Sequence, residues 1–431
     1  MSIRVLRVYH GGRDPQHRAR ERALQAVGVE VTLAVPSQWP ETGHESELPP
    51  EPFRIVELPV KRPGDVNRHA YVAEGDLRRL LADTHPDVLD IHEEPFSVAA
   101  RQWLRAAAEL PVVTYSAQNV DKRFPPPFSR FEAAALRRVA AFYPCSRQAA
   151  SVLRGKGFSG RIEVLPLGYD DAVFRFGAQS LDADEIVLVL VGRLVPEKGV
   201  ADAVRTLAHV HAMRPARLML IGSGSEAGPA MALASSLGVG DRVELAPWRS
   251  GGELAADYQA AHVVLVPSRP TETWVEQFGR VIVEAQASGA VVAGYASGAI
   301  PEVAGDAGIV VPTGDIARLS EAVGRVIADP DEFASRREAG RVQSTARTWH
   351  AVATRQAALY QSVHAGQNER LRLSSSPRRR RAEARAEFGP TASTIAGERP
   401  FAMPILRRGG DVASAIAATI DAASELAARL A

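Results

Sequence analysis

The sequence predicts an α/β protein built from two doubly wound parallel-sheet domains of comparable size. Short apolar runs alternate with helical patterns along residues 1–365, which is typical of repeated strand–helix–strand units. The run Ile186–Val191 is apolar throughout, as expected for a strand buried on both faces. Because the pattern breaks near residues 171–184, we expect a Rossmann-like domain over 1–175 and a second one over 180–345.

The first half begins with an expected strand at 3–9, followed by the glycine pair Gly11 and Gly12. A helical stretch then runs to Gly28, and the next strand is expected at 29–35. Together these segments make one strand–helix–strand unit. Three further strands are expected at residues 88–91, 112–115 and 141–145.

The second half repeats this organisation with six expected strands, separated for the most part by helical patterns. They are expected at residues 186–191, 217–221, 243–245, 263–266, 291–293 and 308–311. A helical stretch at about 331–365 follows and contains Trp349 and Tyr360, which are expected to be core residues.

The composition excludes several classes of protein. The chain has 431 residues, is 46% hydrophobic and 23% charged, and carries a formal net charge of +1. This is ordinary globular usage, without the basic excess of a dedicated nucleic-acid binder. The single cysteine, Cys145, excludes an internal disulfide framework and a Cys-rich metal site. Neither a secretory signal nor a membrane-length apolar run is evident, so a cytoplasmic protein is expected.

The character of the chain changes after about residue 365. Residues 366–431 contain 11 arginines and 7 acidic residues and are rich in alanine. We expect a flexible basic tail that ends in an amphipathic helix. A polybasic run beside such a helix would also suit a peripheral contact with the inner face of a membrane.

The strongest candidate site follows the strand 186–191. The segment Gly192–Gly199 reads GRLVPEKG and carries the cations Arg193 and Lys198. Ligands of doubly wound sheets bind outside the carboxyl ends of the strands, and a helix starting near Gly199 would add its positive end. Two cations and a helix start predict a diphosphate site, whereas solvated loop charges are the alternative.

A second cluster follows the strand 263–266 and therefore lies at the same sheet edge. Glu276 precedes an expected helix, Glu284 lies inside it, and Phe278 and Gly279 stand at its start. Carboxylates accept paired hydrogen bonds from vicinal hydroxyls, so one could hold a ribose and the other a sugar. The alternative is a pair of solvated helix glutamates.

These segments resemble the retaining glycosyltransferases of family 4, which have the GT-B fold and use nucleotide sugars. The resemblance covers roughly residues 1–365. Within the family, the sequence looks most similar to bacterial exopolysaccharide and cell-envelope transferases. The matching segments are Gly11–Gly12, Ile91–Pro95, Gln118–Asn119, Leu165–Asp170, Gly192–Gly199, Ile221–Gly224, Trp274–Glu284, Ser297–Val303 and Val311–Asp315. The resemblance implies two Rossmann-like domains facing a cleft, with residues 346–365 crossing back to the N-terminal domain.

The resemblance also assigns roles around the donor. Arg193 and Lys198 would neutralise the diphosphate, Glu284 would bind the ribose, and Glu276 would lie beside the donor sugar. Backbone groups around Phe278 and Gly279 would contact sugar or phosphate. The glycines Gly192, Gly222 and Gly224 belong to the same donor site. No metal and no cofactor would be needed, because protein cations replace the metal.

Assignments in the first half are more open. The segment His92–Glu93–Glu94 offers two candidates for a catalytic residue beside the donor sugar, His92 and Glu93, and a structural loop is the alternative. Gly11, Gly12 and Asn119 belong to loops expected to approach the acceptor or the phosphates. For the glycine pair, a plain turn is an equal interpretation.

The leading hypothesis is therefore a metal-independent hexosyltransferase. It would move a sugar, with retention, from a UDP- or GDP-sugar to a glycan or lipid-linked acceptor in polysaccharide or cell-envelope synthesis. Two alternatives stay open: a sugar-nucleotide epimerase on the same fold, and a degenerate protein that binds a nucleotide sugar or a partner. Nucleic acid is not an expected partner.

Overall fold

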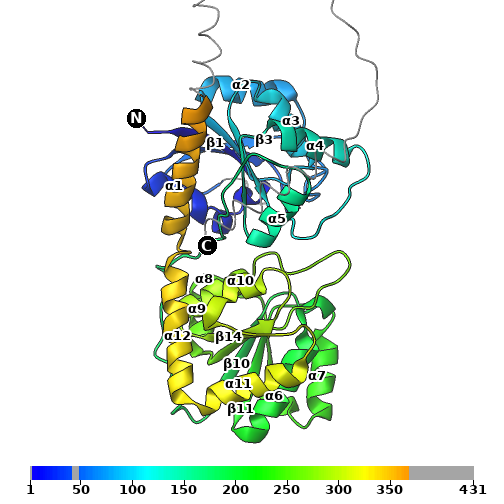
Figure 1. Cartoon of the computed structure of the whole chain (residues 1–431), viewed down its shortest axis with the longest axis vertical. Coiled ribbons are helices and arrows are strands. Elements are labelled where there is room, and N and C mark those ends of the chain that lie inside the picture. Colours follow the sequence, from blue (N-terminus) through cyan, green and yellow to red (C-terminus); the bar gives the residue numbers. More distant parts are fainter. Residues whose placement is uncertain (1, 41–47, 368–431) are drawn as a thin grey trace, which may run out of the picture. The chain divides into compact units, whose positions relative to one another are not determined.

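The structure is a computed structural model, and it describes residues 2–40 and 48–367. The first sheet has seven parallel strands in the order β3–β2–β1–β6–β7–β8–β9. Figure 1 labels β1 and β3 of this sheet. These strands are β1 (Arg4–Val8), β2 (Glu30–Pro36), β3 (Arg54–Leu58), β6 (Val88–Ile91), β7 (Val112–Ser116), β8 (Ala141–Pro144) and β9 (Arg161–Ile162).

Helices lie in most of the connections between these strands, as is usual for parallel pairing. They are α1 (Ala19–Ala26), α2 (Glu74–Thr84), α3 (Val98–Ala106), α4 (Phe128–Arg138) and α5 (Arg147–Gly155). The glycine pair after β1 lies in a short 3-10 turn, η1 (His10–Arg13), and a second turn, η2 (Pro15–His17), follows it. A small antiparallel pair, β4 (Val60–Lys61) and β5 (Ala70–Tyr71), lies outside the sheet.

The second sheet has six parallel strands in the order β12–β11–β10–β13–β14–β15. They are β10 (Ile186–Val191), β11 (Ala216–Ile221), β12 (Val243–Ala246), β13 (Val263–Val266), β14 (Val291–Tyr295) and β15 (Ile309–Val311). The accompanying helices are α6 (Val200–Met213), α7 (Ala227–Ser236), α8 (Gly251–Ala260), α9 (Arg280–Ser288), α10 (Ile300–Ala304), α11 (Ile316–Ala328) and α12 (Pro330–Thr345). Short 3-10 turns complete the order: η4 (Pro196–Lys198), η5 (Gly240–Arg242) and η6 (Gly305–Ala307).

The predicted fold class is confirmed, and every predicted strand is present. All six residues of β10 are buried, as the continuous apolar run indicates, and apolar clusters cover both faces of this sheet. The strands that the pattern missed are β3, β4, β5 and β9. Three of these have only two residues, and β3 is a partly exposed edge strand, so none produces a clear apolar run.

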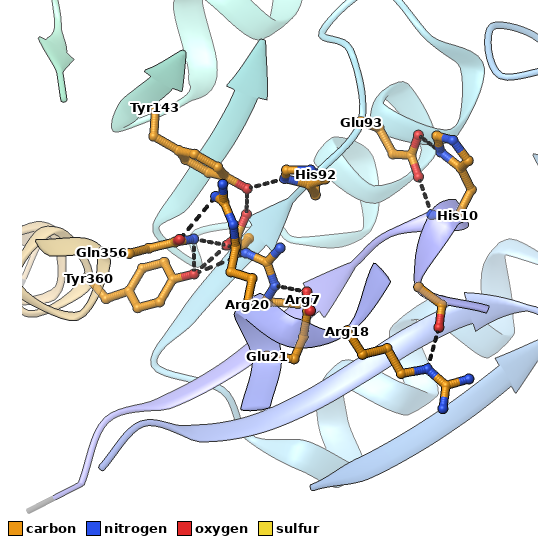
Figure 2. Close-up of polar contacts among 12 residues, drawn as sticks. Arg7, His10, Arg18, Arg20, Glu21, His92, Glu93, Tyr143, Gln356 and Tyr360 are labelled. Atoms are coloured by element: carbon orange, nitrogen blue, oxygen red, sulfur yellow. Dashed lines mark hydrogen bonds and ion pairs between the residues drawn. The ribbon is translucent and has the colours of Figure 1, made fainter. Parts of the chain in front are cut away.

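Residues 349–367 are helical and pack against the first sheet (Figure 1). Tyr360 is fully buried there, among residues of β1 and β2. Its hydroxyl donates a hydrogen bond to Asp90, at the end of β6, and Gln356 Nε2 donates to the same carboxylate at 3.0 Å (Figure 2). Hydrogen bonds to the Asp90 carboxylate therefore hold this helix in place, in addition to apolar packing.

Asp90 also forms an ion pair with Arg7 in β1, and Arg7 is fully buried as well. Arg7 Nε donates to Glu21 Oε1 at 2.8 Å, so one guanidinium serves two carboxylates (Figure 2). Burial lowers the pKa of Arg7, but the charges of Asp90 and Glu21 outweigh burial and raise it well above its usual value. Arg7 is therefore a permanent cation whose charge is satisfied inside the protein.

The domain boundaries 1–175, 180–345 and 346–365 remain predictions. The predicted basic tail over 366–431 lies, from residue 368 onward, outside the described residues. In the part of the chain that is described, none of the helices has the length and apolar character needed to cross a membrane.

Candidate active site

The loop between β10 and α6 carries the first pair of predicted donor residues. Gly199 precedes α6 with a φ of 69°, and a Cβ at this position would lie 2.1 Å from the carbonyl oxygen of Pro267. Only glycine tolerates both this backbone and this contact. The close approach holds the loop of Lys198 against the loop that follows β13, the neighbouring strand.

Two more predicted glycines pack a third loop against the first. A Cβ on Gly222 would lie 2.0 Å from the carbonyl oxygen of Gly192, and one on Gly224 would lie 2.2 Å from that of Leu194. Both glycines have positive φ angles, 135° and 157°. The loops after β10 and β11 are thus in direct backbone contact at the carboxyl edge of the sheet.

Lys198 and Glu276 meet at this edge. Lys198 Nζ lies 2.7 Å from Glu276 Oε2, and Ser268 Oγ donates to the same oxygen at 3.2 Å. The ammonium also lies 4.8 Å from the ring centroid of Trp274, within the range of a cation–π contact. Lys198 keeps about a fifth of its side chain exposed, so the cation is held in place and still reachable from solvent.

Arg193 lies in the same loop but has a different partner. Its Nη2 is 3.4 Å from Glu197 Oε1, and 63% of its side chain is exposed. An exposed pair of this kind contributes little stability. The arginine is therefore free to turn toward a bound anion at low cost.

Helix α9 begins beside the Lys198–Glu276 pair. Gly279 precedes it with a φ of 81°, and no side chain among the described residues caps its start. Uncapped N–H groups at a helix N-terminus favour an anion. Phe278 is 3% exposed and packs in an apolar cluster, so its side chain anchors the turn, and its neighbours Gln277 and Gly279 line a cavity.

Glu284 lies one turn inside α9 and is buried. Arg280 Nη2 donates to its Oε1 at 3.0 Å, and Tyr258 Oη makes a longer contact of 3.5 Å with Oε2. Burial and the Glu284 charge raise the pKa of the Tyr258 hydroxyl well above its usual value, so this hydroxyl stays protonated. Because its contact with Tyr258 is long, Glu284 Oε2 can still accept another hydrogen bond.

Two cavities adjoin these residues. One of about 310 Å³ contains the predicted cations and Glu276 in its wall. Its lining includes Gly192, Arg193, Lys198, Trp248, Ser268, Trp274, Glu276, Gln277, Gly279 and Arg280. A second, of about 570 Å³, is lined by Glu284, Arg280, Trp248 and Arg249, and also by residues of the first half such as Asp14, Gln16 and His17. Trp248, 65% exposed, borders both.

Asn119 connects the two halves of the chain at this site. Its Nδ2 donates to the backbone carbonyl of Glu276 at 2.6 Å, and its own carbonyl accepts from Gln148 at 3.0 Å. Gln277 Nε2 donates to the carbonyl of Ala117 at 3.3 Å in the same region. Residues predicted from separate motifs are thus in contact.

His92 and Glu93 point to different neighbours. His92 lines a small cavity of about 120 Å³ together with Tyr9, Arg20 and Arg280, and its Nδ1 lies 3.0 Å from Tyr143 Oη. Burial, together with the charges of Arg7 and Arg20, lowers the pKa of His92 well below its usual value, so the ring is neutral at pH 7.

Glu93 instead binds His10, accepting from its backbone N–H at 2.7 Å and lying 2.6 Å from its Nδ1 (Figure 2). Burial alone would raise the pKa of Glu93, but the charge and hydrogen bonds of His10 outweigh burial and hold it below its usual value. The two candidates for the residue beside the donor sugar therefore differ in their surroundings: His92 is a neutral ring that lines a cavity, whereas Glu93 is paired with His10.

The glycine pair occupies the turn η1. A Cβ on Gly11 would lie 2.5 Å from the hydroxyl oxygen of Tyr9, and one on Gly12 would lie 3.1 Å from a Leu33 methyl. The carbonyl of Gly12 accepts from Arg18 Nε at 2.6 Å (Figure 2). This turn is tightly packed against β2 and is fixed by a buried arginine.

Sequence reasoning missed four residues of the site: Trp248, Tyr258, Ser268 and Arg280. Arg280 and Glu284 are four residues apart on one helix, a spacing that pairs opposite charges and could have indicated the contact. Trp248 stands beside Arg249 in a loop at the carboxyl edge of the sheet, where ligands bind. Tyr258 gives no such signal, because it lies on a helix as an ordinary core aromatic.

Comparisons with known proteins cover most of the described chain. Residues 21–173 match the model "Glycosyltransferase Family 4", and residues 174–343 match "Glycosyl transferases group 1". D-inositol 3-phosphate glycosyltransferase of Segniliparus rotundus is 32% identical over 220 residues, 48% of this chain and 48% of that protein. The GDP-mannose-dependent alpha-(1-6)-phosphatidylinositol monomannoside mannosyltransferase of Mycolicibacterium smegmatis is 30% identical over 280 residues, 61% of this chain and 65% of that one.

The chain thus spans about half to just under two thirds of these relatives' length. Among solved structures, sucrose-phosphate synthase from Thermosynechococcus elongatus superposes with a TM-score of 0.64 at 21% identity, covering 84% of this chain and 100% of that one. This likeness supports the two-sheet architecture described above. The chain belongs to glycosyltransferase family 4 and has the GT-B fold.

Proposed function

We propose that this protein transfers a sugar from a nucleoside diphosphate sugar to a hydroxyl group of a glycan or lipid-linked acceptor, with retention of anomeric configuration. The observation that carries the proposal is the Lys198–Glu276 pair, held at 2.7 Å in the wall of a cavity at the uncapped start of α9. A held cation, a carboxylate and a helix N-terminus at one sheet edge suit a diphosphate joined to a sugar.

The diphosphate is assigned to Lys198, Arg193 and the start of α9. Lys198 has three N–H donors and can keep one on Glu276 while it donates to a phosphate oxygen. Arg193 lies at the exposed side of the same loop and supplies the second cation. Fixed positive groups of this kind stabilise the charge that develops on a departing diphosphate.

The nucleoside is assigned to the larger cavity, where Glu284, Arg280 and Trp248 line one wall. Glu284 Oε2 is the acceptor for a ribose hydroxyl, because its other oxygen is held by Arg280. The indole of Trp248 is largely exposed at the border of both cavities and offers a face on which a base can stack.

In the reaction, the bond between the anomeric carbon and the β-phosphate oxygen breaks and the acceptor oxygen forms a new bond on the same face. The acceptor's proton passes to a phosphate oxygen, so the products are the new glycoside and a nucleoside diphosphate. Lys198 and the helix start stabilise the leaving group. His92, a neutral ring in the small cavity that Tyr9, Arg20 and Arg280 also line, is the candidate to hydrogen-bond the transferred sugar.

The substrate class follows from the relatives only as a proposal. The names of these relatives mention D-inositol 3-phosphate and phosphatidylinositol monomannoside, and one of them mentions GDP-mannose. A UDP- or GDP-hexose and a sugar or lipid-linked acceptor in polysaccharide or cell-envelope synthesis are therefore the first compounds to test.

The first experiment measures thermal unfolding with UDP, GDP, ADP and their common sugar conjugates, in buffer free of divalent metal. A ligand at a hundred times its Kd adds about 2.7 kcal/mol to the free energy of unfolding, which gives a clear shift in Tm. We expect one nucleotide class to shift the Tm, and Lys198→Ala and Glu284→Ala to abolish the shift. Lys61→Ala and Glu109→Ala, two exposed positions outside the lining of both cavities, are the matched controls.

A shift that persists in both site variants would contradict the assignment of the donor site, and the absence of any shift would contradict donor binding. Product analysis with the bound donor then separates the reactions. A new glycoside and a nucleoside diphosphate support transfer, whereas an epimeric nucleotide sugar formed without a new glycoside would support an epimerase.

A further inference from the structure

Three potential ligand side chains converge in the first half of the chain, outside the donor site. His10 stands at the start of η1, His69 directly before β5, and Glu93 in the loop after β6. Each offers one nitrogen or oxygen atom, and these three atoms all lie within 4.8 Å of one another. The residues come from three loops that are 59 and 24 positions apart, so folding alone brings them together.

His69 is arranged as a metal-binding histidine usually is. Its side chain is fully buried, and its Nδ1 lies 3.2 Å from the backbone carbonyl of Asp65, which can only accept. Nδ1 therefore carries the hydrogen, and Nε2 presents a lone pair. Nε2 has no hydrogen-bond partner among the described residues. A buried polar atom without a partner costs free energy, whereas a metal ligand with its other nitrogen on a carbonyl is a common arrangement.

Glu93 supplies the charge. Its carboxylate is buried and lies against His10, with one oxygen 2.7 Å from the backbone N–H and the other 2.6 Å from Nδ1 (Figure 2). The rings of His10 and His69 lie 5.6 Å apart, and Trp39 packs against both, at 4.8 and 5.1 Å between ring centroids. Aromatic walls of this kind fix the ligand rings in place.

We propose that His10, His69 and Glu93 bind a divalent transition metal ion of the zinc class. Two imidazoles and one carboxylate are a ligand set that zinc prefers, with a fourth position left for water or a substrate atom. Tetrahedral ligands of zinc lie about 3.4 Å apart, so side-chain movements of about an ångström would form the site. Glu93 Oε2 and His10 Nδ1, now 2.6 Å apart, would separate, and the hydrogen that they share would leave as a proton to solvent. The ion would pin the loop of Gly11 and Gly12, because His10 begins that turn.

This inference does not depend on the proposed function. It assigns Glu93 to the cluster with His10 rather than to the donor, and it adds a metal in a region separate from Lys198 and Glu276. The donor site keeps its own cations, so transfer without a metal at the diphosphate remains the expectation there.

The test is a titration of the full chain, freed of metal by a chelator, with Co²⁺ followed by Zn²⁺. We expect one equivalent of Co²⁺ to bind with visible absorption bands, and Zn²⁺ to displace it. His69→Ala and Glu93→Gln should weaken binding by at least about tenfold, since even indirect partners of a metal contribute 10- to 100-fold. His350→Ala, an exposed histidine elsewhere in the chain, should bind as the wild type does.

Thermal unfolding of each metal-free variant checks that it folds, and His69→Gln replaces His69→Ala if the latter does not. Zn²⁺ should raise the Tm of the wild type and of His350→Ala, and should leave the Tm of the cluster variants unchanged. Less than stoichiometric binding to the wild type, or equal binding to the cluster variants, would overturn the proposal.

Discussion

The first strand of each sheet ends close to a group of charges, but the two groups are used differently. Arg7 in β1 is fully buried and is neutralised by Glu21 and Asp90 within the same half of the chain. Lys198, in the loop after β10, lies in a cavity wall with about a fifth of its side chain exposed. The first group holds structure together, whereas the second remains available to a ligand. Burial and the number of internal partners separate a structural charge from a functional one.

Removal of the structural cation should have the largest effect on stability. Arg7→Met leaves two buried carboxylates without their cation, so we expect a loss of about 3–5 kcal/mol in the free energy of unfolding. Urea denaturation measures this value. Arg54→Met, at an exposed position of β3, should change it by less than about 0.5 kcal/mol. If Arg7→Met lowered the free energy of unfolding only slightly, Arg7 would not have the structural role that distinguishes it from Lys198.

Removal of Lys198, the cation that we propose binds the donor, should act on activity instead. Lys198→Ala should lower kcat by about 10²- to 10³-fold, the usual cost of losing one group that stabilises developing charge. Its free energy of unfolding should change by only about 1 kcal/mol, because the pair with Glu276 is partly solvated. Steady-state kinetics with the donor found by the Tm survey measures the first value. A variant that loses stability but keeps kcat would reverse the assignment.

The glycine contacts at the sheet edge sharpen the comparison further. Gly222→Ala places a Cβ 2.0 Å from the Gly192 carbonyl at a φ of 135°, so we expect a loss of about 1–3 kcal/mol together with weaker nucleotide binding. Gly228→Ala is the matched control, because it lies on α7 with open space around its Cβ position. That change should stabilise the protein by about 0.4–1 kcal/mol. Equal behaviour of the two variants in denaturation would show that the loop contact is dispensable.

The low pKa of His92 gives the smallest predicted effect. Above pH 6.5 the ring is neutral in both the folded and the unfolded chain. As the pH falls below 6.5, the unfolded chain takes up a proton at this residue and the folded chain does not, so stability decreases. This contribution reaches about 1.4 kcal/mol per pH unit.

His92→Asn removes the titrating group and keeps an amide that can reach Tyr143. Its free energy of unfolding should therefore fall less steeply than that of the wild type between pH 6.5 and 5. Denaturation at several pH values measures the slope. Parallel slopes would mean that His92 takes up its proton normally in the folded protein, which would contradict the enclosure described here.

The sequence predicted that Lys198 and Glu276 lie at one sheet edge, because this placement follows a general rule. Lys198 and Glu276 are 78 residues apart, yet both follow neighbouring parallel strands, β10 and β13, whose carboxyl ends lie at one sheet edge. The apolar run of β10 located that edge directly. The long contact from Tyr258 depends on the orientation of α8, and the placement of Trp248 depends on the path of a loop. Periodicity fixes neither.

The first half was harder to predict for a physical reason. Arg7 and Asp90 stand inside strands, where alternating polar residues usually face solvent, so only the fold shows that they are buried together. His10, His69 and Glu93 lie in three separate loops and have no metal-ligand spacing in the sequence. Such a cluster is visible only after folding, when loops far apart along the chain meet.

The most direct test of the account compares the affinities of a nucleoside diphosphate and its monophosphate by titration calorimetry. The wild type should prefer the diphosphate, in buffer without divalent metal, because we propose that Lys198, Arg193 and the start of α9 bind the second phosphate. Lys198→Ala should lose most of this preference, and Lys61→Ala should keep it. A preference that is absent from the wild type, or unchanged in Lys198→Ala, would contradict the assignment of the diphosphate to this loop.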